Sequence, residues 1–249
     1  MGTSGILGEK IALVTGASRG IGAGIAKKLA SLGAQVAINY RANEQAARAT
    51  VEEIRKQGGI AELFAADVAD AAAVRAMVAA VAERFGRIDI LVNNAGTFGV
   101  RLLGEIDATF FAEQFVANTL SMILVTQEAL RHFPASGGRI ISVSSRLAYS
   151  PSEGTSVHAA AKAAVSTLTH AFARELGRRH ITVNAVAPGP TETDMIRGMP
   201  PELRETIAAA TPIGRMGGPA DIAGLVACLA SEDAGWVTGR TILVDGGLT

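Results

Sequence analysis

Short apolar runs alternate with longer amphipathic stretches along almost the whole chain. Several of the short runs are continuously apolar, which is the pattern of a strand buried on both faces of a sheet. We predict strands at residues 11–15, 35–39, 61–66, 88–93, 139–144, 182–187 and 241–244. Between them, apolar residues recur every three to four positions, as on a helix with one buried face. We predict helices at residues 21–32, 44–57, 71–85, 110–133, 156–177 and 220–229.

This order of elements indicates an α/β fold with a seven-stranded, parallel, doubly wound sheet and helices on both faces. A length of 249 residues suits one Rossmann-type domain that spans residues 1–249. Residues 188–218 are rich in Pro, Gly, Thr and Met and follow a strand. We therefore expect an irregular loop there that covers a ligand, although an ordinary surface excursion has the same composition.

Charge and cysteine content narrow the function classes. Lys+Arg and Asp+Glu both number 23, and no basic run stands out, so we expect neither a nucleic-acid partner nor a membrane. The single cysteine, Cys228, excludes an intramolecular disulfide and suits a reducing, cytoplasmic location. The four histidines show no metal-ligand spacing, and we expect no metal site.

A glycine-rich segment lies between the first predicted strand and the first predicted helix. Glycines permit a sharp turn and a close approach of the backbone to a pyrophosphate, and the helix N-terminus presents unpaired N–H groups. This placement favours a dinucleotide site, against the alternative of a turn without a ligand. The residues concerned are Gly16, Ser18, Arg19, Gly20, Ile21 and Gly22.

The ends of the next strands indicate which dinucleotide binds. The second strand ends at Tyr40 and Arg41 without the acid that would bind the ribose of NAD, and Arg41 with Arg19 can pair with a 2′-phosphate. We therefore expect NADP(H), although a solvated Arg41 is the alternative. After the third strand, Asp67 and Val68 suit an adenine base. After the fourth, small residues leave room for a ribose and nicotinamide: Asn94, Ala95 and Gly96.

Taken in order, these motifs resemble the short-chain dehydrogenase/reductase family. The resemblance extends from Lys10 to Gly247 and includes residues 15–22, 93–96, 188–189 and 244–247. In character the chain is similar to 3-oxoacyl-carrier-protein reductases and related carbonyl reductases. The family implies the strand order 3-2-1-4-5-6-7, a nicotinamide cofactor, a small-molecule carbonyl substrate, and a homodimer or homotetramer.

The same resemblance implies roles for individual residues. Lys162 would bind the nicotinamide ribose, Ser145 the substrate carbonyl, and Asn118 a water that links Lys162 to solvent. Ser144 is adjacent to Ser145, and we prefer Ser145 because its spacing to position 158 fits the family pattern. Contacts to the nicotinamide side would come from Pro188, Gly189, Thr191 and Thr193.

One position departs from the family pattern. Four residues before the lysine, where the family has its catalytic tyrosine, the chain has His158. The charge of Lys162, one helical turn away, should lower the pKa of His158 and favour a neutral imidazole, which is a poor proton donor.

Three interpretations of His158 follow. It replaces the tyrosine as the acid, directly or through a water. Alternatively, the substrate is a quinone or polyaromatic ketone, whose reduction needs little protonation. In the third interpretation, the chain binds NADPH as a regulatory or catalytically impaired relative.

Overall fold

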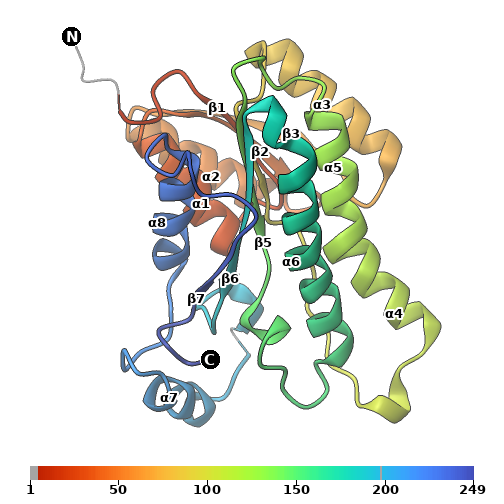
Figure 1. Ribbon diagram of the computed structural model, residues 1–249. Helices are drawn as coiled ribbons and strands as arrows, with labels where there is room; N and C mark the ends of the chain where they lie inside the picture. Colours follow the sequence, from red (N-terminus) through yellow and green to blue (C-terminus); the bar gives the residue numbers. More distant parts are fainter. Residues whose placement is uncertain (1–4, 197) are drawn as a thin grey trace.

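Seven parallel strands form one sheet in the computed structural model, which describes residues 5–196 and 198–249 (Figure 1). The order across the sheet is β3-β2-β1-β4-β5-β6-β7. Strand number, direction and order confirm the predicted fold, and the predicted strand ends are correct to within two residues. The strands are β1 (Ile11–Val14), β2 (Gln35–Tyr40), β3 (Ile60–Ala65), β4 (Ile90–Asn93), β5 (Gly138–Val143), β6 (Ile181–Pro188) and β7 (Thr241–Val244).

Helices cover both faces of this sheet (Figure 1). One hydrophobic core lies between the sheet and α1 (Gly20–Ser31), α2 (Glu44–Lys56) and α8 (Pro219–Ala230). The other lies between the sheet and α3 (Ala71–Phe85), α5 (Ser121–Ala129) and α6 (Ser156–Leu176). Successive residues of β1 point to opposite cores, which explains why an unbroken apolar run forms this strand.

The predicted helix at residues 110–133 is wrong in two respects. It consists of α4 (Ala108–Phe115), a π-helical turn η2 (Val116–Leu120) and α5, and it ends at Ala129. A π turn inserts one extra residue per turn, and its stability depends on contacts outside the helix. Apolar periodicity alone therefore could not predict it.

The expectation of an irregular loop at residues 188–218 is also wrong in part. Helix α7 (Pro201–Ala210) lies within this segment, near the bottom of the view in Figure 1. Proline is compatible with the first turn of a helix, where its missing N–H leaves no intrahelical bond unmade. None of the α7 residues is buried, which explains why no apolar periodicity marked it.

The stretch Ala108–Ala129 is long and apolar enough to cross a membrane by length and composition, and 39% of its 18-residue apolar segment is buried. One such helix is weak evidence for a span. In this fold α5 packs against α3 and β4, and α4 packs against α6. These are the contacts of a core helix.

Because all strands run in the same direction, the segments that follow them leave the sheet at one edge. The glycine loop, the segment after β4 and the segment after β5 meet there. Ligands of open α/β sheets bind at this carboxyl edge.

Candidate functional site

The glycine loop that joins β1 to α1 is fixed from two strands. Gly16 and Gly20 have φ angles of 61° and 58°, which other residues rarely adopt. Asn94 donates through Nδ2 to the backbone oxygens of Thr15 (2.9 Å) and Gly16 (3.0 Å). Thr15 Oγ1 in turn accepts from the backbone N–H groups of Asn94 and Ala95, both at 3.0 Å. The loop is therefore ordered by the protein itself.

The start of α1 fits a phosphate group. Arg19 is the N-cap residue, and its side chain makes no capping hydrogen bond. The first N–H groups of the helix are therefore not bonded by the side chain of the N-cap residue. A Cβ at Gly22 would lie 2.4 Å from Asn94 Nδ2 and 2.5 Å from the oxygen of Gly16. Only glycine fits there. Ser18 and Ile21 are half-buried in the same loop. These features match a pyrophosphate of a dinucleotide.

Two exposed arginines lie where a 2′-phosphate is expected. Arg19 Nη1 is 3.8 Å from Asp194 Oδ2, and Arg41 Nη1 is 3.7 Å from Asp67 Oδ2. Tyr40, at the end of β2, is half-buried. Each arginine is thus partnered by an aspartate, and the sequence indicated neither ion pair.

The side chain of Asn39, next to the end of β2, makes its hydrogen bonds within the protein. Its side chain is buried, accepts from the N–H of Gly16 (3.1 Å), and donates to the oxygens of Phe64 (3.2 Å) and Ala66 (3.1 Å). It therefore ties the glycine loop to β3. Val68 is buried just beyond, beside the predicted adenine position.

Asn118 projects from the π turn and holds the segment after β4. Its Nδ2 donates to the oxygens of Thr97 and Gln114, both at 2.9 Å, and its Oδ1 accepts from the N–H of Thr97 at 3.2 Å. A Cβ at Gly96 would lie 2.5 Å from Asn118 Oδ1. The glycine at position 96 therefore allows this clamp to form.

Lys162 is buried on α6 and reaches the carboxyl end of β5. Its Nζ donates to the oxygen of Val143 at 2.8 Å. Burial lowers the pKa of Lys162 to about 8. A Cβ at Gly96 would lie 3.4 Å from Nζ, so the ammonium group is close to the small residues expected beside the nicotinamide.

His158 is buried one turn before Lys162 and is 6% exposed. Its ring meets Phe98 edge to face, with centroids 5.0 Å apart and planes at 83°. Its Nδ1 has no hydrogen-bond partner within the described part of the chain. Burial and then the charge of Lys162 lower the pKa of His158 to about 4, although a hydrogen bond with the Thr97 backbone opposes the change. The imidazole is therefore neutral near pH 7.

The two neighbouring serines differ in their surroundings. Ser144 is buried, and its Oγ donates to the oxygen of Lys162 (2.9 Å) and lies 3.1 Å from Ser166 Oγ. Ser145 is half-buried, and its Oγ accepts from the N–H of Leu147 (3.2 Å), which leaves its own proton available for another bond. Ser144 thus ties β5 to α6, and Ser145 stays the candidate substrate contact.

The segment after β6 lies against the glycine loop. Pro188 ends the strand, and Thr191 Oγ1 donates to the oxygen of Gly189 at 2.9 Å. The methyl group of Thr193 would lie 3.4 Å from a Cβ at Gly20. A nucleotide in the glycine loop would therefore meet these residues.

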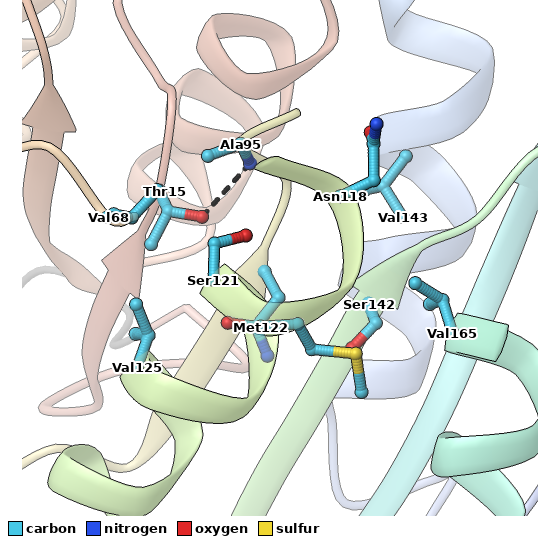
Figure 2. Close-up of a pocket in the computed structure, with 11 residues that line it drawn as sticks. Thr15, Val68, Ala95, Asn118, Ser121, Met122, Val125, Ser142, Val143 and Val165 are labelled. Atoms are coloured by element: carbon cyan, nitrogen blue, oxygen red, sulfur yellow. Dashed lines mark hydrogen bonds between the residues drawn. The ribbon is translucent and has the colours of Figure 1, made fainter. Parts of the chain in front are cut away.

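A small cavity lies between the sheet and η2–α5, and Figure 2 shows the side chains around it. Two polar atoms of residues that line it, Asn93 Oδ1 and Ser142 Oγ, have no hydrogen-bond partner in the described structure. The cavity is narrow and adjoins Asn118. Its lining residues are Thr15, Val68, Asn93, Ala95, Asn118, Ser121, Met122, Val125, Ser142, Val143 and Val165.

A larger, open cleft of about 740 Å³ lies beside α6. Residues 101–103, 147–148 and 151–154 line it, together with Ser156, Ala159, Ala160 and Ala163. His158 and Lys162 do not line this cleft. Across residues 5–196 and 198–249, no group of three or more His, Cys, Asp or Glu side chains is placed to hold a metal ion.

Known proteins resemble this chain over almost its full length. A family profile described as enoyl-(acyl carrier protein) reductase matches residues 16–249. The 3-oxoacyl-[acyl-carrier-protein] reductase of Staphylococcus aureus is 42% identical over 96% of this chain and 98% of its own. A hydroxynaphthalene reductase-like protein of Metarhizium majus is 40% identical over 97% of this chain and 95% of its own.

Among solved structures, a short-chain dehydrogenase of Burkholderia cenocepacia in complex with NADP is 42% identical, with a TM-score of 0.92. The similarity covers 97% of this chain and 98% of that one. The chain therefore belongs to the short-chain dehydrogenase/reductase family of oxidoreductases, and NADP(H) is its cofactor.

Proposed function

We propose that this protein is an NADPH-dependent reductase of a conjugated carbonyl, either a quinone or a polyaromatic ketone. Ser145, His158 and Lys162 would surround the reacting oxygen. The observation that carries the proposal is the environment of His158, which is buried against the Phe98 ring and feels the charge of Lys162.

This environment removes His158 as a proton donor. With a pKa of about 4, only about one imidazole in a thousand is protonated at pH 7. A neutral imidazole still forms hydrogen bonds, but it releases a proton only with difficulty. General acid catalysis usually accelerates a reaction about 10²- to 10⁴-fold, and an aliphatic ketone loses this contribution.

The lack of a general acid slows the reduction of a conjugated carbonyl much less. NADPH, when bound, would supply a hydride, and the oxyanion that a quinone would then carry is delocalised and weakly basic. Lys162, with a pKa of about 8, is about nine-tenths protonated at pH 7, so its charge can stabilise this anion. Ser145 can donate a hydrogen bond to the same oxygen. The proton can then come from solvent after the hydride step.

Two further observations support a planar aromatic substrate. Phe98 is 41% exposed beside His158 and offers a ring against which such a substrate can stack. One relative at 40% identity is described as hydroxynaphthalene reductase-like, and hydroxynaphthalene is a fused aromatic compound.

Exposed apolar side chains on α4, on the segment before it and on the η2 turn after it support self-association as a homodimer or homotetramer. Leu103 is 88% exposed, and Phe111 and Leu120 are also exposed. Light scattering on the purified protein would measure the assembly, and a monomer at micromolar concentration would contradict this part of the proposal.

The test of the activity compares two substrates and two proteins. NADPH oxidation is followed at pH 7 with a quinone and with an aliphatic ketone, for the unaltered protein and for His158→Tyr. We expect quinone reduction by the unaltered protein, and a gain of at least about 10²-fold in ketone reduction for His158→Tyr. Equal rates on both substrates before the substitution would contradict the proposal. NADPH binding without turnover of either substrate would instead favour a regulatory protein.

A further inference from the structure

Both arginines expected to bind the 2′-phosphate are paired with aspartates. Arg19 and Asp194 are 60% and 38% exposed at the side chain, and their charged atoms are 3.8 Å apart. Arg41 and Asp67 are 75% and 43% exposed, with a separation of 3.7 Å. Water screens exposed pairs of this kind, so their partners can be exchanged.

The Arg19 pair differs from the other because it joins two separate parts of the site. Arg19 belongs to the glycine loop, and Asp194 begins the 3₁₀ turn η5 (Asp194–Ile196) in the segment after β6. Next to Asp194, the Thr193 methyl group approaches Gly20. A 2′-phosphate on Arg19 therefore has to compete with a carboxylate from the segment that lies against the loop.

We propose that Asp194 is a specificity-determining residue, which occupies Arg19 in the cofactor-free protein and yields it to the 2′-phosphate of NADPH. Asp194 then weakens NADPH binding but not NADH binding, since NADH has no phosphate to contact Arg19. This inference rests on the proposed role of Arg19 in the cofactor site and is independent of His158 and of the substrate.

The size of the effect follows from the exposure of the pair. Exposed ion pairs shift an equilibrium by about two- to fivefold. Replacement of Asp194 by asparagine keeps the size of the side chain and removes the charge. It should therefore tighten NADPH binding about two- to fivefold.

The chain offers a matched control on the same segment. Glu192 is exposed two residues before Asp194, and no ion pair of Glu192 occurs among the described residues. Glu192→Gln removes the same charge from nearly the same place. A general electrostatic effect would appear in both variants, and competition for Arg19 only in Asp194→Asn.

The experiment measures the Kd of NADPH and of NADH from the fluorescence of the reduced nicotinamide. The proteins are the unaltered chain, Asp194→Asn, Glu192→Gln, Arg19→Ala and the Arg19→Ala/Asp194→Asn double variant. We expect tighter NADPH binding in Asp194→Asn, unchanged NADH binding, no effect of Glu192→Gln, and no effect of Asp194→Asn when Arg19 is absent.

Three results would overturn the role of Asp194. In the first, Asp194→Asn lowers the Kd of NADH as much as the Kd of NADPH. In the second, Glu192→Gln lowers the Kd of NADPH as much as Asp194→Asn does. In the third, Asp194→Asn still lowers the Kd of NADPH when Arg19 is replaced by alanine. A different result would contradict the cofactor site itself: Arg19→Ala would then leave the preference for NADPH over NADH unchanged. The two failures are therefore distinguishable.

Discussion

Burial of His158 should make the protein less stable in mild acid. The folded chain holds this imidazole at a pKa of about 4, whereas the ordinary value is 6.5. Well above pH 6.5 the group is neutral in both states and has almost no effect on the free energy of unfolding. As the pH falls towards 4, the unfolded chain binds a proton that the folded chain does not, so this free energy decreases.

The two pKa values set the size of this loss. Their difference corresponds to a maximum of about 3 kcal/mol, reached below pH 4. Between pH 7 and pH 5 the loss is about 2 kcal/mol. A typical domain is stable by about 5–15 kcal/mol, so a change of this size is easily measured.

Urea unfolding at several pH values would detect the effect in a comparison of variants. His158→Phe keeps an aromatic ring against Phe98 and removes the titrating group. We expect the unaltered protein to lose about 2 kcal/mol more than His158→Phe between pH 7 and pH 5. His180→Asn replaces an exposed histidine whose φ of 57° asparagine tolerates, and it serves as the control. If the free energy of unfolding depended on pH in the same way in the unaltered protein and in His158→Phe, the predicted contribution of His158 would be refuted.

Three other substitutions test the site. Gly96→Ala places a Cβ 2.5 Å from Asn118 Oδ1 and should destabilise the fold by about 1–3 kcal/mol, measured by thermal unfolding. Ser144→Ala should cost about 1 kcal/mol of stability, since it removes the bond to the Lys162 oxygen, and unchanged stability would contradict this structural role. Ser145→Ala should instead lower quinone turnover by about 10²-fold with little change in stability, which steady-state kinetics would show.

Features that depend on local backbone preference could be predicted from the sequence. Buried parallel strands require continuous apolar runs, and the sheet has the predicted strands in the predicted order. Gly16 and Gly20 have positive φ angles, which is the reason that glycine occurs there. The sequence also indicated that the charge of Lys162, one helical turn away, lowers the pKa of His158, but the larger cause, burial, came only from the structure.

Features that depend on contacts between distant segments could not be predicted. The π turn at Asn118 is paired with the backbone of Thr97, which precedes it by 21 residues. Arg19 and Asp194 are far apart in the chain, and no pattern joins them. Phe98 follows the small residues after β4, but only the packing of α6 reveals that its ring meets His158.

The pH dependence of quinone reduction tests the central claim most directly, because it asks whether His158 delivers a proton in the reaction. A donor with a pKa of about 4 would lose about tenfold in rate for each pH unit above that value. We predict that kcat/KM for the quinone stays constant between about pH 5.5 and 7 and falls above pH 8, as Lys162 loses its charge. A steady tenfold loss per unit between pH 5.5 and 7 would contradict the account.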